Sequence, residues 1–216
     1  MISKNLKIRM YTSLVLLSLV ILIFNFNLIL VYSLIILGVI SILEFLEMIK
    51  QIPNLKYSKI FYSFFFILYI FLFCLAFFLF SNLHGLKVII YTLLFGCIAS
   101  DIGGFIFGKT FKGPKLTKIS PNKTFSGALG SIIFSTTVVS SLFFYFIDNF
   151  SFTILIIGVV TSVFCQIGDL LFSYLKRKAN LKDTGNFLPG HGGVLDRLDG
   201  IFLGIPFGFL SLIILY

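Results

Sequence analysis

Long apolar segments alternate with short polar loops along this sequence. Each segment is about 20 residues long, the length that an α-helix needs to cross the hydrocarbon core of a bilayer. The seven segments span residues 9–25, 28–47, 61–80, 87–107, 127–147, 151–174 and 198–216. Only a polar turn at 25–27 separates the first two, which predicts a tight helical hairpin. The pattern predicts an all-α, polytopic membrane bundle with about seven transmembrane helices.

Composition agrees with this class of protein. The chain is 58% hydrophobic and only 12% charged, which excludes an ordinary soluble domain. Residues 1–10 are basic and precede an apolar run, as in a signal peptide, but no small-residue cleavage site follows. We therefore expect this run to remain as the first helix. We expect a single integral membrane domain over 1–216, with N-terminal helices in 1–86 and the chemistry in 87–216.

The distribution of positive charge predicts the orientation in the membrane. If the N-terminus is cytoplasmic, 16 of the 17 Lys and Arg residues fall in cytoplasmic segments, and Lys87 alone lies on the other face. This bias follows the positive-inside rule. It explains the net charge of +9 without nucleic acid, which we do not expect as a partner. The two longest hydrophilic loops, 108–126 and 175–197, are then both cytoplasmic.

The few acidic residues are concentrated in one part of the chain. Four of the eight lie within 31 residues, and a fifth precedes the first long loop. These five are Asp101, Asp169, Asp183, Asp196 and Asp199. The basic or imidazole side chains among them are Lys176, Arg177, Lys178, Lys182, His191 and Arg197. Ionisable groups at or near membrane depth are costly and usually mark a site, so function should be sought in 173–199.

Helical spacing suggests how some of these groups are presented. Asp169, Ser173 and Lys176 share one helical face, and Asp196 and Asp199 share another. Two helices can thus direct two or three carboxylates to one point at the cytoplasmic boundary. Oxygen ligands of this kind suit Mg²⁺, especially when it is shared with phosphates. The alternative for any single Asp is an ion pair with a nearby Lys or Arg, but four acids together favour a site.

Two cytoplasmic loops carry further candidates. The glycines of 189–193 permit positive φ and a close approach of backbone N–H groups to an anion, just before a helix begins. The sequence is compatible with two roles for His191: a contact with a phosphate and a structural hydrogen bond. Lysines along the earlier loop suit a polyphosphate, although they equally satisfy the positive-inside rule. Among them we favour Lys123, together with Asp101.

Taken together, these segments resemble the signature of phosphatidate cytidylyltransferases (CDP-diacylglycerol synthases). The matching positions are Ser100-Asp101, Gly108-Lys109, Ile119-Ser120-Pro121-x-Lys123-Thr124, Gly168-Asp169-Leu170, Ser173-x-Leu175-Lys176-Arg177, Lys182-Asp183, Pro189-x-His191-Gly192-Gly193 and Asp196-Arg197-x-Asp199. A composite signature of this length is highly specific. The chain departs from the family in being shorter than most members and in having Ser126 where many carry an acid.

The resemblance implies an activity and a set of site residues. Such enzymes condense CTP with phosphatidate, with Mg²⁺, to give CDP-diacylglycerol and pyrophosphate. The resemblance does not decide whether a second cation takes part. As metal ligands we predict Asp169, Asp196 and Asp199. As catalytic residues we predict Lys176, Arg177, Lys182, Asp183, His191 and Arg197. As substrate-binding residues we predict Asp101, Lys109, Lys123, Ser173, Gly192 and Gly193. The resemblance further implies a homodimer. The distribution of Lys and Arg predicts an active site that faces the cytoplasm, and we expect the protein in a bacterial inner membrane.

Two other classes of function use similar residues. A CTP-dependent polyprenol or dolichol kinase would transfer the γ-phosphate and release CDP; the run from Lys182 to Asp199 favours the cytidylyltransferase instead. A cation transporter would use acids at mid-membrane, whereas these acids adjoin long basic loops. A structural homologue without activity is disfavoured because the acids are present.

Overall fold

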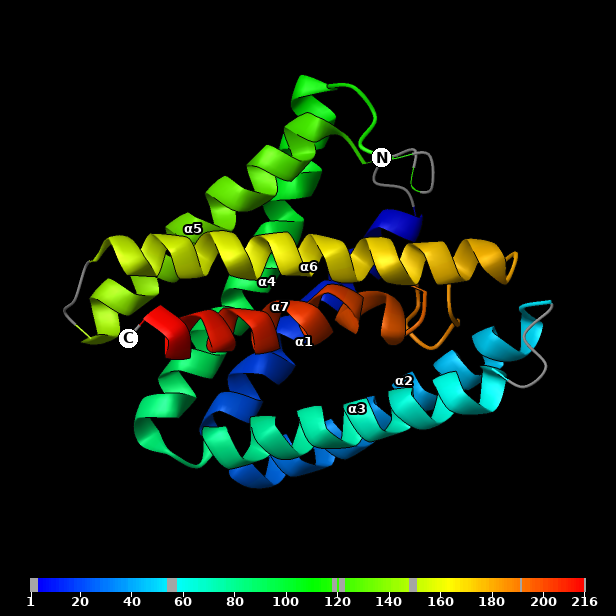
Figure 1. Ribbon diagram of the computed structural model, residues 1–216, viewed down its shortest axis with the longest axis horizontal. Coiled ribbons are helices and arrows are strands. Elements are labelled where there is room, and N and C mark those ends of the chain that lie inside the picture. Colours follow the sequence, from blue (N-terminus) through cyan, green and yellow to red (C-terminus); the bar gives the residue numbers. More distant parts are fainter. Residues whose placement is uncertain are drawn as a thin grey trace. The chain divides into compact units, whose positions relative to one another are not determined.

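Seven helices account for most of the described backbone of this chain. The computed structural model describes residues 4–53, 58–117, 120, 123–147, 151–190 and 192–215, with side chains from residue 11 onward. The helices are α1 (Lys4–Asn25), α2 (Asn27–Gln51), α3 (Ser58–Ser81), α4 (His84–Phe111), α5 (Phe125–Ile147), α6 (Phe152–Lys178) and α7 (Leu195–Leu215) (Figure 1). Besides them, the described residues contain only two isolated β-bridges. The all-α prediction is confirmed.

The helices have the length and composition of membrane spans. Six of them, α2 to α7, are long and apolar enough to cross a bilayer, and in α1 a shorter apolar stretch runs over Tyr11–Asn25. The protein is therefore an integral membrane protein. Helix α2 extends to Gln51 and α6 to Lys178, each four residues beyond the predicted end. The reason is that the apolar pattern reports membrane depth, whereas a helix continues into the polar interface.

The chain divides into two compact units. The first comprises Met1–Asn82 with Leu175–Leu198, and the second comprises Leu83–Tyr174 with Asp199–Tyr216. Helices α6 and α7 each contribute residues to both units. The first unit therefore joins the N-terminal helices to the glycine-rich loop between α6 and α7. The expectation of one membrane domain over the whole chain stays a prediction.

In the first unit, α1 packs on α2 and α2 packs along α3, as Figure 1 shows. The rings of Phe45 and Phe66 stack with centroids 3.8 Å apart. Leu30, Met48 and Ile70 are almost fully buried between the helices. Large apolar side chains elsewhere on α1 and α3 are exposed, as expected for surfaces that face lipid tails.

Glycine contacts hold the helices of the second unit close together. A Cβ atom on Gly103 of α4 would lie 2.4 Å from the carbonyl oxygen of Gly130 in α5. On α7, Gly200, Gly204 and Gly208 recur every four residues and pack on side chains of α4 and α6. Small residues at such spacing let helix backbones approach closely within membranes. This packing fixes the second-unit part of α7 against α6.

Candidate active site

In the first unit, the end of α6 and the start of α7 are joined by a buried ion pair. Lys176 Nζ lies 2.7 Å from Asp196 Oδ1, and the two side chains are 11% and 7% exposed. The other oxygen of Asp196 accepts hydrogen bonds from the backbone N–H groups of Thr184 at 2.8 Å and Gly193 at 3.0 Å. Both carboxylate oxygens of Asp196 are therefore occupied by donors of the protein itself.

The loop before α7 adopts the turns that its glycines permit. Gly190 and Gly192 have φ values of 76° and 83°, and the N–H of Leu188 donates to the carbonyl of Gly192 at 2.9 Å. This confirms the expectation of positive φ in the glycine run. The N–H of Gly193, however, donates to Asp196. His191 lies outside the described residues.

Several charged residues at the end of α6, in the following loop and at the start of α7 lie on the surface of the first unit. Lys182, Asp183 and Arg197 are exposed, and so is Arg177, which donates to the carbonyl of Leu181 at 3.3 Å. Exposed cations of this kind are accessible to phosphate groups. Their assigned roles stay predictions.

A second ion pair lies in the second unit. Lys123, just before α5, pairs with Asp169 of α6. Ser173 Oγ donates to Asp169 Oδ1 at 3.3 Å, as expected for residues on one helical face. The side chains of Lys123 and Asp169 are 25% and 32% exposed, so a substrate can reach them. Gly168, the residue before Asp169, packs closely against the backbone of α7.

Two further acids lie beside α6, Asp199 of α7 and Asp101 of α4. A Cβ atom on Gly168 would lie 2.5 Å from the carbonyl oxygen of Asp199. Asp199 is buried, and its Oδ1 accepts the N–H of Gly200 at 2.8 Å. Asp101 of α4 accepts a weak hydrogen bond from Cys165 Sγ at 3.9 Å. Backbone contact thus places Asp199 beside the residue preceding Asp169.

These acids fit a metal that is shared with a substrate better than a closed protein cage. Among the described residues, no three His, Cys, Asp or Glu side chains gather as a set of metal ligands. Mg²⁺ is commonly held by one or two carboxylates together with substrate phosphates and waters. Asp169 and Asp199 offer oxygen donors of that kind. Asp196 has both oxygens engaged, so its assignment to the metal stays a prediction without support from its contacts.

The loop from 112 to 124 is anchored to the start of α5. Thr124 Oγ1 accepts the N–H of Gly127 at 3.1 Å, which is the bond of a helix N-cap. Ser126 Oγ lies 3.0 Å from Thr124 Oγ1 and accepts the N–H of Gly113 at 3.3 Å. Ser126, where many members of the resembled family carry an acid, therefore helps to fix the loop. Of the other predicted residues here, Lys109 lies 5.6 Å from the ring centroid of Phe105.

This cap leads to a testable expectation. We expect Thr124→Ala to lower the stability of the protein by about 1 kcal/mol, because it removes the acceptor for an N–H of the first turn. The thermal unfolding midpoint in detergent measures the change. Thr124→Ser keeps the hydroxyl and should restore most of the loss. Equal midpoints for the Ala and Ser variants would contradict the capping role.

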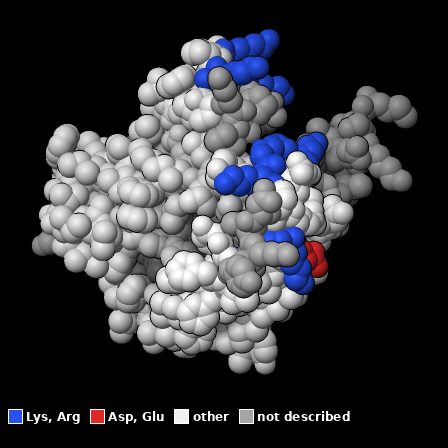
Figure 2. All heavy atoms as spheres, turned by 45° about the vertical axis from the view of Figure 1, so that its right-hand side comes forward, with Lys and Arg blue, Asp and Glu red and all other residues white. Residues whose placement is uncertain are grey.

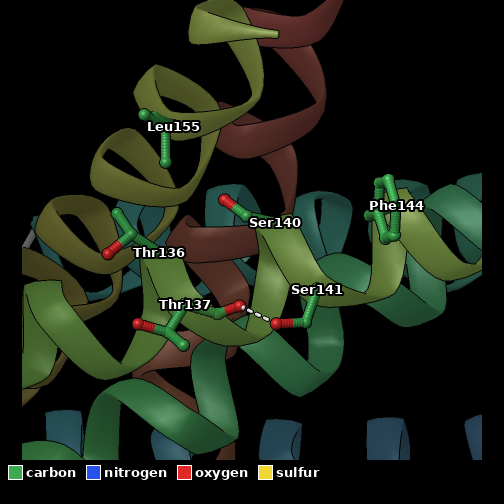
Figure 3. A pocket seen from close by; sticks show the side chains of 6 residues that line it. All are labelled: Thr136, Thr137, Ser140, Ser141, Phe144 and Leu155. Atoms are coloured by element: carbon green, nitrogen blue, oxygen red, sulfur yellow. Dashed lines mark hydrogen bonds between the residues drawn. The ribbon is translucent and has the colours of Figure 1, made fainter. Parts of the chain in front are cut away.

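A groove in the second unit does not have the chemistry of a nucleotide site. It has a volume of about 380 Å³ and is lined by Thr136, Thr137, Ser140, Ser141, Phe144 and Leu155 (Figure 3). Its hydroxyl groups face their own helix in part, since Ser141 Oγ donates to the carbonyl of Thr137 at 2.7 Å. None of these six lining residues is charged, whereas a triphosphate needs cations. On the face shown in Figure 2, the described Lys and Arg side chains occur in a few groups and most of the surface carries no charge.

Two residues in contact with the Lys176–Asp196 pair or its partners were not singled out from the sequence. Thr184 donates its backbone N–H to Asp196, and its hydroxyl donates to Glu44 of α2 at 3.0 Å. The available signal for Glu44 was an acid inside an otherwise apolar helix, the same signal that identified Asp169.

Comparison with known proteins agrees with these motifs. Residues 3–215 match the Cytidylyltransferase family, which is essentially the whole chain. The chain belongs to this family. Its relatives include the phosphatidate cytidylyltransferase of Rickettsia typhi, with 38% identity over 182 residues, which is 79% of this chain and 78% of that protein.

Other relatives of the same name match over a shorter region. The enzyme of Rickettsia felis is 44% identical over 124 residues, covering 53% of this chain and 55% of the relative. That of Helicobacter pylori is 41% identical over 117 residues, covering 54% and 44%. The chain thus aligns with about half the length of these two family members.

Proposed function

We propose that this protein transfers the cytidylyl group of CTP to phosphatidate, giving CDP-diacylglycerol and pyrophosphate. The observation that carries the proposal is the family match over residues 3–215, with relatives named phosphatidate cytidylyltransferase at 38–44% identity among those compared above. The two Lys–Asp pairs support it, because a reaction between two polyanions needs fixed cations beside acidic groups. The six candidate spans support a lipid substrate.

The proposed reaction is a nucleophilic substitution at the α-phosphorus of CTP. The phosphate of the lipid attacks the α-phosphorus of CTP, a new P–O bond forms, and the bond to pyrophosphate breaks. Because the attacking oxygen is already an anion, a strong general base is not required. The barrier lies in bringing two polyanions together and stabilising the departing charge, which positioned cations lower.

In the second unit, we assign Mg²⁺ binding to Asp169 and Asp199. Both offer carboxylate oxygens on helices that the Gly168 contact holds together. The metal, when bound, supplies positive charge to the phosphates of CTP. Lys123 is assigned to the pyrophosphate side, and Asp101 and Ser173 to orienting roles.

In the first unit, we assign phosphate binding to the basic residues at the end of α6 and in the following loop. These are Lys176, Arg177 and Lys182. Asp183 is assigned to orient one of them. Asp196 is also a predicted metal ligand, but its contacts favour a role in holding Lys176 and the glycine loop. His191, Arg197, Gly192 and Lys109 keep their predicted roles at the substrate phosphates.

The proposal includes a location and an assembly. The basic loops favour the cytoplasmic face of a bacterial inner membrane, where a lipid head group lies at the interface and CTP arrives from water. We further propose a homodimer, which rests on family resemblance alone.

Product analysis tests the proposed function. The full chain, purified in detergent micelles, is incubated with phosphatidate, Mg²⁺ and CTP labelled at the α-phosphate. We expect label to enter the lipid fraction and pyrophosphate to be released. Label that remained in soluble CDP while an added polyprenol became phosphorylated would replace the proposal with a lipid kinase. Absence of turnover on both lipids would overturn enzymatic function.

A further inference from the structure

A buried acid of the N-terminal helices reaches the glycine-rich loop. Glu44 lies on α2 and is 7% exposed, whereas Glu47, one turn later, is exposed. An ionised carboxylate inside a protein is unfavourable unless hydrogen-bond donors surround it. The two acids of α2 therefore differ in environment, although they lie on the same helix three residues apart.

The donors that surround Glu44 come from the start of α7 and from the loop before it. Its Oε1 accepts the backbone N–H of Val194 at 3.0 Å, and its Oε2 accepts the N–H of Leu195 at 2.8 Å. The hydroxyl of Thr184 donates to Oε2 at 3.0 Å. The first N–H groups of a helix lack partners within it, and negative charge is favourable there. Glu44 thus caps α7 from another helix.

Glu44 and Asp196 together accept the backbone hydrogen bonds of the segment before and at the start of α7. The backbone N–H groups of Gly193, Val194 and Leu195 donate in succession to Asp196, Glu44 and Glu44. Thr184 connects the two carboxylates, because its N–H donates to Asp196 and its hydroxyl to Glu44. Asp196 in turn holds Lys176. Thr184 and Asp196 therefore link Glu44 to Lys176 through hydrogen bonds.

The space around the carboxylate accounts for two of the loop glycines. A Cβ atom on Gly193 would lie 2.2 Å from Thr184 Oγ1 and 2.5 Å from Glu44 Oε2. A Cβ atom on Gly185 would lie 2.5 Å from Glu44 Oε1. All three distances are far inside van der Waals contact. The bare backbone at these positions is what allows Glu44 to reach its donors.

We infer that Glu44 is a positioning residue of the active site: it holds the loop between α6 and α7 and the start of α7, and thereby sets Asp196 and Lys176 for substrate phosphates. This inference rests on the proposed function for its effect on catalysis. We assign Glu44 no direct contact with the substrate. Its hydrogen bonds to the loop, however, have a measurable consequence whatever the substrate is.

The test compares Glu44→Gln with the control Glu47→Gln in the full chain in detergent micelles. Glutamine has the size of glutamate but places an amide N–H₂ against at least one backbone N–H, so the segment loses an acceptor. We expect kcat/KM for CTP to fall by about 10–100-fold, with a raised KM, as for other residues that orient ligands indirectly. The control should change less than about twofold, as expected for an exposed site.

Separate measurement of KM and kcat distinguishes a positioning role of Glu44 from an effect on folding alone. A variant that merely leaves part of the protein unfolded lowers the apparent kcat and keeps the KM for CTP of the surviving enzyme. An unchanged KM in Glu44→Gln would therefore overturn the inference. If this variant fails to fold, Thr184→Val replaces it, because it removes only the hydroxyl that donates to Glu44 and keeps the backbone N–H that donates to Asp196. It should raise the KM in the same direction and by less.

Limited trypsin cleavage gives a readout that is independent of activity. Lys182 lies in the loop that Glu44 holds, and cleavage after it requires the loop to open locally. We expect cleavage in Glu44→Gln to be about tenfold faster than in the wild type and Glu47→Gln. Equal rates would overturn the inference. If the wild type shows no cytidylyl transfer, the proposed function fails, and the cleavage rates alone still decide whether Glu44 holds the loop.

Discussion

Asp169→Asn is expected to nearly abolish cytidylyl transfer, with a fall in rate of about 10²–10³-fold at saturating CTP and phosphatidate. The substitution keeps the shape of the side chain but removes the charge that pairs with Lys123 and that we assign to the metal. It leaves a neutral amide beside a lysine at a partly exposed position. Steady-state rates measured across a Mg²⁺ titration give the size of the loss and any shift in the metal concentration needed for half-maximal rate.

The control for this experiment is Glu47→Gln, which removes the charge of an exposed carboxylate on α2. Its rate should match that of the wild type. The assignment of Asp169 fails if the Asn variant retains more than about a tenth of the wild-type rate at ordinary Mg²⁺, since loss of a charge-stabilising group normally costs more. Purified yield and chromatographic profile of the two variants show whether both are folded.

Gly168→Ala is expected to damage both stability and turnover. Its Cβ atom would lie 2.5 Å from the carbonyl oxygen of Asp199 and 3.2 Å from the Cα of Gly200, so α6 and α7 must move apart. Those neighbours are backbone atoms and cannot rotate away. Overpacking of this kind costs about 1–3 kcal/mol, occasionally more. Displacement of a positioned group by about 1 Å costs on the order of 10²-fold in rate.

A matched glycine substitution separates this contact from a general effect of alanine. A Cβ atom on Gly85, in the first turn of α4, would meet no neighbouring atom within 4 Å, so Gly85→Ala should leave stability and rate unchanged. The thermal unfolding midpoint and the transfer rate are measured for both variants. Wild-type values for Gly168→Ala would show that the close approach of α6 and α7 is not required.

The positions of the helices along the sequence could be predicted because the bilayer requires apolar segments of about the same length. Segments of about 20 apolar residues were enough to place all seven helices within a few residues of their observed positions. The pattern could not show that α6 continues to Lys178, because the last turn is polar. It also gave no sign that the loop before α7 belongs with the N-terminal helices.

Within the candidate site, contacts along one helix were predictable and contacts between distant segments were not. Helical spacing placed Ser173 on the same face as Asp169, and the structure shows their hydrogen bond. The pairing of Asp169 with Lys123 joins residues on different elements, so spacing alone gave no partner. Glu44 was missed for the same reason: its acceptor role depends on N–H groups 150 and 151 residues away.

A glycine before a helix has two physical explanations in this loop: binding of a phosphate, and packing against a side chain of the protein itself. Glycine next to a helix start is typical of phosphate binding, which is the role predicted for Gly193. In the structure, a side chain at this position would collide with Thr184 and Glu44, and its N–H serves Asp196. The sequence pattern is the same in both cases, because close approach to any anion, bound or built in, requires the same absence of a Cβ atom.

The hydrogen bonds of Glu44 also constrain the order in which the protein is completed during synthesis. Glu44 leaves the ribosome 151 residues before Leu195, which supplies one of its backbone partners. Until the loop before α7 and the first residue of α7 have been translated, α2 carries a carboxylate whose native set of donors is incomplete. The N-terminal hairpin is therefore made early in translation, but it reaches its native hydrogen bonding only when the seventh helix enters the membrane.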